Sequence, residues 1–534
     1  MSSVVTADPL ETLTFDNRFV NTLPADPEHR NNRREVRNAC YSLVEPTPVA
    51  KPHVLSYSPE ASALLDLTEE QCRTPSFAEI LAGNRLLPGM QPFAMRYGGH
   101  QFGSWAGQLG DGRAINLGEI VNRRGRRWTL QLKGAGPTPY SRRADGLAVL
   151  RSSLREFICS EAMHHLGIPT TRALSLVTTG EQVLRDMFYD GHPCHEPGAV
   201  VCRLAPSFLR FGNFEIHTAT GEIELLRQLV DYSLVTDFAD LSAKPGPDGY
   251  LAWFSEICRR TGELVVHWMR VGFVHGVLNT DNMSILGLTI DYGPYGWLED
   301  YDPSWTPNTT DAQGRRYCYG NQPQIALWNL VQLANAIYPL IEESEPLQAA
   351  LDVYRKTFQR GWRQALADKL GLTGREDGDD SLMQRTLELL AEQHLDMTIF
   401  FRRLADLPAD PSIPIDFPSF FADAYYQNAT GEPGQAPLND WLSAYRTRIG
   451  TANGDDQQHR RTMMNRVNPK YVFRNYLAQL AIEQAEQGDA SLIEELLEVL
   501  RRPYDEQPGK EKFAQRRPEW ARNRAGCSML SCSS

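Results

Sequence analysis

The chain has 534 residues, of which 42% are hydrophobic and 22% are charged, and its formal net charge is −12. This hydrophobic content is too high for a disordered chain, and no run of about 18 apolar residues is present to span a bilayer. The acidic balance excludes a general nucleic-acid binder, although it allows a small anion to be held in a local basic pocket. The length corresponds to roughly three ordinary domains, or to one large fold with additions.

The start of the chain and its cysteines indicate in which cellular compartment the protein is expected. Residues Met1–Val20 have no apolar core and carry three acids before the first arginine, so they match neither a secretory signal nor a transit peptide. The nine cysteines include no CxxC pair, which argues against a disulfide framework. We therefore expect a cytoplasmic protein with reduced thiols, without membrane or nucleic acid among its partners.

The first part of the chain is predicted to be an irregular lead that ends at a glycine-rich segment. Residues 1–90 are rich in proline and polar side chains, and they predict an extension with one short helix near Thr68–Cys72. Six glycines then fall between Gly98 and Gly112, and Arg113 follows directly. Such a run is typical of tight turns between strands, and also of loops that hold phosphates.

Charged side chains follow on the next predicted elements. The alternation of residues 128–133 predicts a half-buried strand, with Lys133 on its polar face and directed into a cleft. A helix is predicted over residues 147–165, with Glu156 on the flank of its apolar stripe. A second strand carries Arg203. Helices dominate downstream, and we expect them at residues 251–271, 324–338, 347–370, 380–392 and 492–501.

A short segment after the first long downstream helix is the most informative. The sequence His275-Gly-Val-Leu-Asn-Thr-Asp-Asn282 precedes an apolar stretch, predicted to be a hairpin that turns near Gly287, and Asp291-Tyr-Gly follows. Protein kinases need a glycine-rich segment, a strand lysine, a helix glutamate and then an Asn and an Asp, in this order, to hold phosphates and a metal. The pattern predicts an α+β, two-lobed, protein-kinase-like fold with an N-terminal extension and helical C-terminal additions.

This segment departs from the kinase pattern at one position. His275 and Asn282 are separated like the His and Asn of the kinase catalytic loop H-R-D-x-x-x-x-N, but Val277 stands where the base Asp is expected. An apolar side chain cannot accept a proton. The next carboxylate in the segment is Asp281.

Longer stretches carry a resemblance to a known family. These are residues 96–113, 130–142 and 275–296, together with Tyr319-Gly-Asn-Gln-Pro, Asn468-Pro-Lys-Tyr and the ending Ser531-Cys-Ser-Ser. They resemble the selenoprotein O family (SelO or YdiU), which consists of kinase-fold protein adenylyltransferases. The resemblance implies that ATP binds flipped and that AMP is transferred to Ser, Thr or Tyr hydroxyls of proteins, with release of pyrophosphate.

The resemblance also implies roles for individual residues. Asp281 would accept the proton, and Asn282 and Asp291 would hold Mg²⁺ or Mn²⁺. The nucleotide site implied by the family comprises Gly110, Gly112, Arg113, Lys133, Asp145, Gly146, Arg203, Arg210 and Asp291, with Glu156 paired to Lys133. The chain would then divide into an extension (1–90), a nucleotide-binding N-lobe (91–232), a catalytic and metal-binding helical C-lobe (233–505) and a tail (506–534) with Cys527 and Cys532.

Several alternatives stay open. The family resemblance implies redox control through a C-terminal cysteine, in which Cys318 would pair with Cys527 or Cys532. Transfer of UMP from UTP is a related reaction, since nothing in the sequence identifies the base pocket. An ordinary phosphotransferase that uses Asp281 as a displaced base, and a non-catalytic nucleotide-binding scaffold, are further candidates. Val277 disfavours the phosphotransferase, and the retained set of metal-type and phosphate-type residues disfavours the scaffold.

Overall fold

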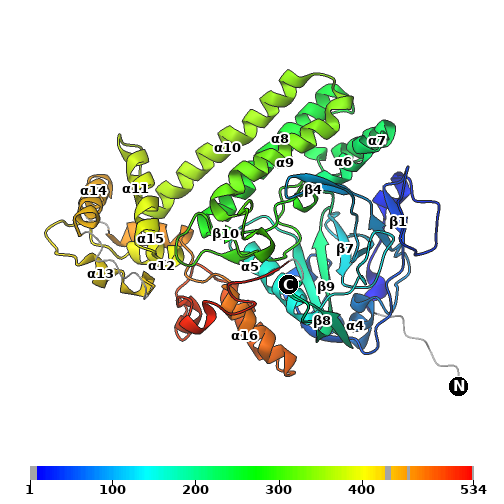
Figure 1. Cartoon of the computed structure of the whole chain (residues 1–534), viewed down its shortest axis with the longest axis horizontal. Helices are drawn as coiled ribbons and strands as arrows, with labels where there is room; N and C mark the ends of the chain where they lie inside the picture. The colour runs from blue at the N-terminus through cyan, green and yellow to red at the C-terminus, as the bar shows by residue number, and fades with distance from the viewer. Residues whose placement is uncertain (1–8, 427–434, 454–456, 532–534) are drawn as a thin grey trace.

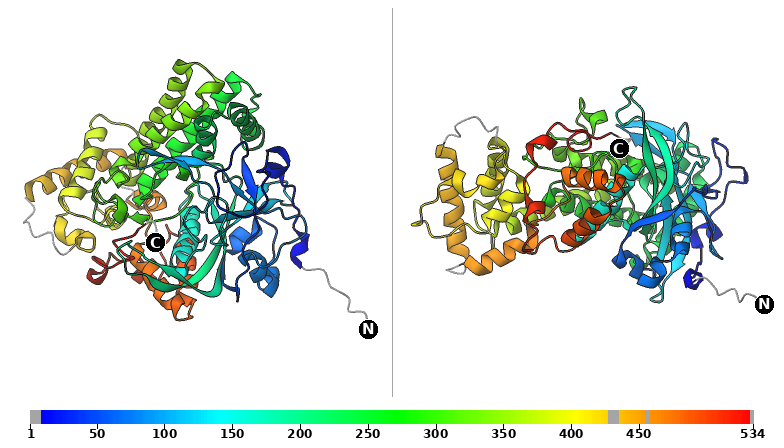
Figure 2. Two further views of the ribbon diagram at one scale, coloured as in Figure 1. Left: turned by 45° about the vertical axis from the view of Figure 1, so that its right-hand side comes forward. Right: turned by 90° about the horizontal axis from the view of Figure 1, so that it is seen from below.

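The computed structural model describes residues 9–426, 435–453 and 457–531. It consists of a sheet-rich part, built mostly from the N-terminal residues, and a helical part that follows it in the chain (Figures 1 and 2). The predicted α+β class is confirmed.

The sheet-rich part centres on one antiparallel sheet of seven strands. Its order is β1-β3-β6-β7-β9-β8-β2, so the longest strands lie in the middle and on one side. The strands are β1 (Tyr41–Leu43), β2 (His53–Tyr57), β3 (Phe93–Met95), β6 (Ala114–Val121), β7 (Arg127–Lys133), β8 (Arg172–Arg185) and β9 (Cys194–Ala205). A separate hairpin, β4 (Gly98–Gln101) and β5 (Ser104–Gln108), precedes β6.

The N-terminal residues are more ordered than their composition predicted. Strands β1 and β2 form the two edges of the sheet. Each pairs with a strand from later in the chain, β1 with β3 and β2 with β8. Helices α2 (Pro59–Ala63), α3 (Glu69–Cys72) and α4 (Pro75–Ala82) follow β2. The expected short helix is α3, which begins at a capping box formed by Thr68 and Gln71. The expectation of an otherwise irregular lead is wrong for the described residues.

Each face of the sheet packs against its own hydrophobic core. Leu130 and Leu132 of β7 belong to a core that includes Phe77 and Ile80 of α4. The opposite face packs against α5 (Leu150–His165), whose apolar residues join the large core that extends into the helical part. As predicted, Lys133 shares that second face with the other polar residues of β7, and its side chain is buried.

The helical part is built around long helices that were largely predicted. The helices that follow α5 are α6 (Phe211–Ala219), α7 (Ile223–Thr236), α8 (Pro247–Val271), α9 (Gln322–Ile337), α10 (Ser344–Leu370), α11 (Asp379–Glu392), α12 (Met397–Leu404), α13 (Phe417–Phe420), α14 (Gln435–Asn453), α15 (Gln457–Val467), α16 (Asn475–Glu486) and α17 (Ser491–Leu500). Helix α1 (Arg18–Thr22) precedes the sheet. Helices α8 and α10 run side by side along the upper edge of the molecule in Figure 1.

The predicted hairpin between Asn282 and Asp291 does not form. The chain does turn before Gly287, but its two arms bridge to other elements: Ser284 pairs with Arg210, and Thr289 pairs with Thr170. Both partners belong to the sheet-rich part or its connection to α6. The apolar stretch therefore ties the two parts together instead of pairing with itself.

The C-terminal end returns to the sheet-rich part. Helices α16 and α17 pack against α5, and Glu494 of α17 accepts a hydrogen bond from Ser56 of β2 at 2.6 Å. In Figure 2 the last segment, coloured red, lies between the two parts. Leu530 forms a parallel bridge with Asn308. Among the described residues, no helix has the length and apolar character needed to cross a membrane.

Candidate functional site

A cavity of about 680 Å³ gathers most of the residues singled out from the sequence. It lies where the sheet meets the segment from Val277 to Pro294. Of the predicted site residues, its walls include Gly110, Gly112, Arg113, Lys133, Asp145, Gly146, Arg203, Asp281, Asn282 and Asp291. Glu156 and Arg210 are buried behind this lining and contact residues in it. Sequence positions up to 181 residues apart thus converge on one cavity.

A cluster of buried charges occupies the inner wall of the cavity. Lys133 Nζ lies 2.7 Å from Glu156 Oε2 and 3.2 Å from Asp291 Oδ1. Arg203 Nη1 bridges the same two carboxylates, at 2.7 Å from Glu156 Oε1 and 2.6 Å from Asp291 Oδ1. Strand β7, helix α5 and strand β9 each contribute one of these side chains. The predicted pairing of Lys133 with Glu156 is therefore present in the geometry.

Asp291 is the centre of this cluster. Arg210 pairs with its Oδ2, so three cations, Lys133, Arg203 and Arg210, surround one carboxylate. Burial opposes the ionisation of Asp291, but these cations hold its pKa well below the usual range. Its backbone has φ 55°, in the left-handed region that non-glycine residues seldom adopt. Asp291 is thus an ionised carboxylate held in an uncommon backbone conformation, a combination that is frequent at functional sites.

Asp281 has a different environment. It is buried, and its Oδ2 accepts a hydrogen bond from Gln101 Nε2 at 3.2 Å, whereas its Oδ1 has no hydrogen-bond partner among the described residues. Burial raises the pKa of Asp281 to about 7, although Gln101 and Arg210 favour the ionised form. A carboxylate that lines a cavity and has a pKa near neutrality is suited to accept a proton.

Asn282 presents an oxygen to the same cavity. Its Nδ2 donates to the carbonyl of Val277 at 2.9 Å, which leaves the amide oxygen available as a ligand. Together with Asp291 it forms a pair of hard oxygen donors, the type that Mg²⁺ and Mn²⁺ prefer. The donor chemistry of the two residues therefore fits a divalent metal.

The loop that carries Asp281 and Asn282 is held by buried hydrogen bonds. His275 Nε2 lies 3.0 Å from the carbonyl of Ile290, so the start of the loop is linked to the residue before Asp291. The backbone N–H of His275 donates to Gln322 Oε1 of α9 at 3.0 Å. Asn308 Nδ2 donates to the carbonyl of Gly276 at 3.0 Å. Hydrogen bonds to the residue before Asp291, to α9 and to Asn308 thus hold the loop in position relative to Asp291.

The outer wall of the cavity contains cations that the sequence analysis did not select. Arg142, Arg143 and Arg185 line it together with Arg113. Arg185 pairs with Asp145 at 2.8 Å, so the carboxylate assigned to the nucleotide is engaged by an arginine. Arg185 lies 40 residues from Asp145 in the sequence, and no local spacing could have connected the two.

The β4–β5 hairpin is the other element that sequence reasoning missed. Gln101 bonds Asp281, and the N–H of the neighbouring His100 donates to Thr280 Oγ1 at 2.7 Å. A Cβ on Gly99 would lie 2.7 Å from Asp281 Oδ1, so the close approach requires glycine. The sequence offers one signal for the role of this hairpin. Gln101 is a polar residue among the glycines of the segment, at a position where a simple turn needs no polar side chain.

The cysteines implicated in redox control are not joined in the structure. Cys318 and Cys527 are both buried free thiols. Cys532 lies outside the described residues, so its pairing with Cys318 stays a prediction. The tail does lie near the relevant segment, because Leu530 accepts a hydrogen bond from the N–H of Thr309 at 2.7 Å.

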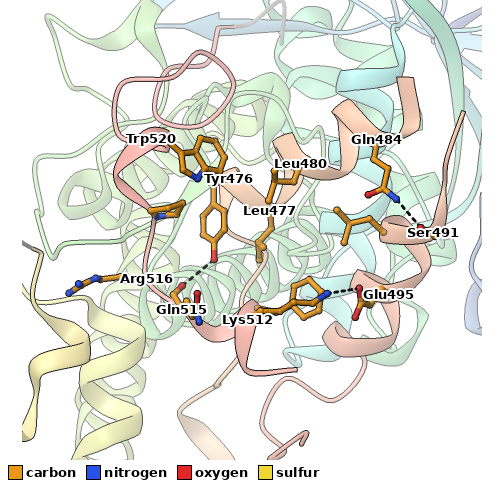
Figure 3. A pocket seen from close by; sticks show the side chains of 13 residues that line it. Tyr476, Leu477, Leu480, Gln484, Ser491, Glu495, Lys512, Gln515, Arg516 and Trp520 are labelled. Atoms are coloured by element: carbon orange, nitrogen blue, oxygen red, sulfur yellow. Dashed lines mark hydrogen bonds and ion pairs between the residues drawn. The ribbon is translucent and has the colours of Figure 1, made fainter. Parts of the chain in front are cut away.

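A second hollow, of about 490 Å³, lies away from these residues (Figure 3). Residues of α16, α17 and the C-terminal segment line it, with Tyr476 and Trp520 on one side and the ion pair of Lys512 with Glu495 on another. Its ionisable side chains include neither a carboxylate cluster nor a buried cation among the described residues. The charge cluster and the Asp281 loop make the larger cavity the candidate active site.

Comparison with known proteins agrees with this geometry. Residues 26–501 match the family model described as "Protein adenylyltransferase SelO". A protein of Rhodopirellula baltica named protein nucleotidyltransferase YdiU is 60% identical over 537 residues, covering 98% of this chain and 99% of the relative. A protein of the same name from Aromatoleum aromaticum is 59% identical, covering 98% of this chain and 100% of the relative. The chain therefore belongs to the SelO family of protein adenylyltransferases.

Proposed function

We propose that this protein transfers AMP from ATP to Ser, Thr or Tyr hydroxyls of protein substrates and releases pyrophosphate. The observation that carries the proposal is a single cavity that joins several cationic side chains to Asp281, while Val277 lines the wall where a kinase base would lie. Cations on separate elements suit a triphosphate, and a free carboxylate oxygen suits a hydroxyl donor. The family membership of the chain supports the same reaction.

We propose that the two parts of the molecule correspond to the lobes of a protein kinase, with residues 91–232 as the N-lobe and 233–505 as the C-lobe. The lysine on a central strand, the glutamate on the helix beside the sheet and the Asp291 segment at the junction support this. Kinases use the same three elements to position nucleotide phosphates. Strands β1 and β2 add edges to the sheet from residues outside the proposed N-lobe.

The residues of the chain would act in the following way. Lys133, Arg203 and Arg210 would bind phosphate oxygens, with Arg113 at the outer wall. The acceptor oxygen forms a bond to the α-phosphorus as the bond from that phosphorus to the oxygen bridging the β-phosphate breaks, and pyrophosphate leaves. Asp281, which lines the cavity, takes the hydroxyl proton on its carboxylate. Catalysis of this kind relies on positioning and on charge stabilisation.

Asn282 and Asp291 would hold the divalent metal, Mg²⁺ or Mn²⁺. Bound there, the metal would supply positive charge that neutralises the phosphate oxygens during transfer. Asp291 is already ionised and oriented by its arginines, so its oxygens need no proton loss before they bind. The ion pairs with Lys133, Arg203 and Arg210 hold these oxygens in place.

Three alternative functions would use the same cavity. UMP transfer from UTP would need no change in the phosphate-binding residues. Those residues would contact the phosphates through their charges, and none of them identifies which nucleobase is bound. An ordinary kinase would need a base near the γ-phosphate, and Val277 supplies none. A scaffold that only binds nucleotide has no need for a cavity-lining carboxylate, such as Asp281, with a pKa raised to about 7.

The proposal is tested with ATP labelled at either the α- or the γ-phosphate, with Mg²⁺ or Mn²⁺ and a mixture of candidate acceptor proteins. We expect label on protein from the α-position only, together with release of pyrophosphate. Label from the γ-position only would establish a kinase instead. An Asp291→Ala variant should lose a factor of ~10² or more in transfer, because the phosphate charge would then go uncompensated. UTP in place of ATP, run in parallel, identifies the preferred nucleotide.

A further inference from the structure

The β4–β5 hairpin exposes two large aromatic side chains next to the candidate active site. Phe102 and Trp105 are 41% and 38% exposed. We name as the aromatic platform the surface formed by Phe102, Trp105, Arg316 and Trp328. The first two belong to the hairpin, Arg316 to the segment before α9, and Trp328 to α9.

Ring contacts join these side chains into one surface. Phe102 packs against Tyr317, with the ring centroids 5.2 Å apart. Trp105 lies 5.1 Å from the His100 ring, and His100 lies edge-on to Trp328 at 5.5 Å. The guanidinium carbon of Arg316 lies 4.7 Å from the centroid of Trp328. The platform therefore spans the hairpin and the helical part without a break.

The platform adjoins Asp281 directly. Gln101, which donates to the Asp281 carboxylate, is the residue before Phe102. The N–H of Phe102 donates to the Tyr317 hydroxyl at 2.8 Å, and that hydroxyl donates to Asn279 Oδ1 at 2.5 Å, within the Asp281 loop. A chain segment lying on the platform would have its neighbouring residues close to the Asp281 carboxylate, which is proposed to accept the proton.

Arg316 brings a cationic side chain to the platform, and the nearby Asp311 carboxylate offsets part of its charge. Its Nε is buried without a hydrogen bond, and no described carboxylate forms an ion pair with its guanidinium. The guanidinium carbon would lie 3.3 Å from a Cβ on Gly103, so it sits against the tip of the hairpin. An arginine stacked on an aromatic face keeps N–H groups free for a carboxylate.

We propose that the aromatic platform docks the acceptor segment of the protein substrate, and that this segment carries an apolar or aromatic residue and an acidic residue beside the modified hydroxyl. This inference rests on the proposed transfer to proteins. The aromatic side chains bind the apolar residue, and Arg316 binds the acidic one. The nucleotide is not the occupant, because none of Phe102, Trp105 and Arg316 lines the cavity that holds the cationic cluster.

The test uses short synthetic peptides with one central serine. One peptide carries Phe and Asp beside the serine, a second carries Ala at both positions, and a third carries Phe and Lys. Transfer from α-labelled ATP is measured, and binding of the same peptides is followed by fluorescence anisotropy without nucleotide. We expect wild-type kcat/KM for the Phe-Asp peptide to exceed that for the Ala peptide by about tenfold or more, the size of one well-placed ion pair or aromatic contact.

Three variants separate docking from chemistry. Phe102→Ser and Trp105→Ser should raise KM for the Phe-Asp peptide about tenfold with kcat nearly unchanged, because they remove contacts made before the reaction. Arg316→Glu should abolish the preference for Asp and favour the Lys peptide. Tyr338→Ser and Arg375→Glu, which change an exposed tyrosine and an exposed arginine outside the platform, serve as matched controls. Thermal unfolding of each variant checks its fold.

The outcomes are distinguishable. Equal kcat/KM for all three peptides in wild type and variants would overturn the docking proposal while leaving adenylyl transfer intact. If no peptide or protein is labelled with any nucleotide, the proposed function fails, and the anisotropy measurement still decides whether the platform selects the Phe-Asp peptide. A concentration-dependent dimer that disappears in Trp105→Ser would assign the platform to a second copy of the chain and overturn the proposal.

Discussion

At the residue scale, two positions of one loop, Val277 and Asp281, distinguish the site from that of a kinase. Val277 is apolar and lines the cavity, whereas Asp281 is buried four residues later with one oxygen free of partners among the described residues. Gln101 and the burial of the carboxyl group determine when Asp281 is ionised. If Asp281 accepts the proton as proposed, its position along the loop would decide which phosphate of a bound nucleotide can react.

The Val277→Asp variant tests this division directly. It restores the kinase-type carboxylate, but we expect no transfer of the γ-phosphate, because a flipped nucleotide places no γ-phosphate near position 277. The α-labelled and γ-labelled assays described above provide the measurement. Asp281→Asn is the companion variant, and it should slow transfer by ~10²–10⁴ while nucleotide binding is retained. Robust γ-phosphate transfer by Val277→Asp would show that the site is a kinase lacking one residue.

The environment of Asp281 also predicts a pH dependence. Its pKa is raised to about 7, chiefly by burial, so the carboxylate is ionised above that pH and protonated below it. Only the ionised form can accept a proton, and kcat/KM should therefore fall as the pH decreases through about 7. A kcat/KM profile that reports the free enzyme measures this. The residual activity of Asp281→Asn should lack the acidic limb, and a wild-type profile flat from pH 6 to pH 8 would contradict the assignment.

At the scale of elements, the β4–β5 hairpin and the Asp281 loop fit each other through a glycine. Gly99→Ala would place a Cβ 2.7 Å from Asp281 Oδ1. Overpacking of this kind costs ~1–3 kcal/mol, and here it would also displace the carboxylate. We expect a lower melting temperature and reduced transfer, measured by thermal unfolding and by the α-label assay. Gly450→Ala, with open space around its helical position, is the control and should be neutral or slightly stabilising.

The sequence predicted elements well where the pattern was local. The alternation of Leu130 and Leu132 located β7, and the apolar stripe of α5 located the helix that carries Glu156. The stretch from 283 to 290 was predicted as a hairpin because it is apolar and contains Gly287, yet its partners, Arg210 and Thr170, lie more than 70 residues away. Pairing of this kind depends on tertiary packing, which local periodicity does not encode.

The same distinction applies to the candidate site. The resemblance to a family selected residues whose order along the chain matches a kinase, and the cavity gathers ten of them. The sequence analysis missed Gln101 and Arg185 because their roles depend on contacts with distant residues. Gln101 contacts Asp281, which is 180 residues away, and Arg185 contacts Asp145, which is 40 residues away. The edge strands β1 and β2 escaped for a similar reason, since short strands of three and five residues acquire their partners only in the assembled sheet.

At the scale of the whole molecule, the C-terminal segment braces the region beside the active-site loop. Leu530 is fully buried, and its backbone pairs with residues 307–309, while Asn308 bonds Gly276. Leu530→Ala should cost ~2–5 kcal/mol and loosen that region. Hydrogen exchange at residues 307–311 should rise and transfer should fall. Met529→Ala, at a 40% exposed side chain, is the matched control. Unchanged exchange in Leu530→Ala would show that the tail does not brace the loop.

The bridge between Asn308 and Leu530 also sets the order in which the molecule can be completed during its synthesis. A ribosome adds ~5–20 residues per second, and N-terminal regions fold first. The cavity residues up to Asp291 therefore emerge well before residue 530 exists. The segment at Asn308 can pair with Leu530 only after the chain between them has been synthesised. A nascent chain can thus gather the charged cluster early, but the site is braced by this bridge only once residue 530 has emerged.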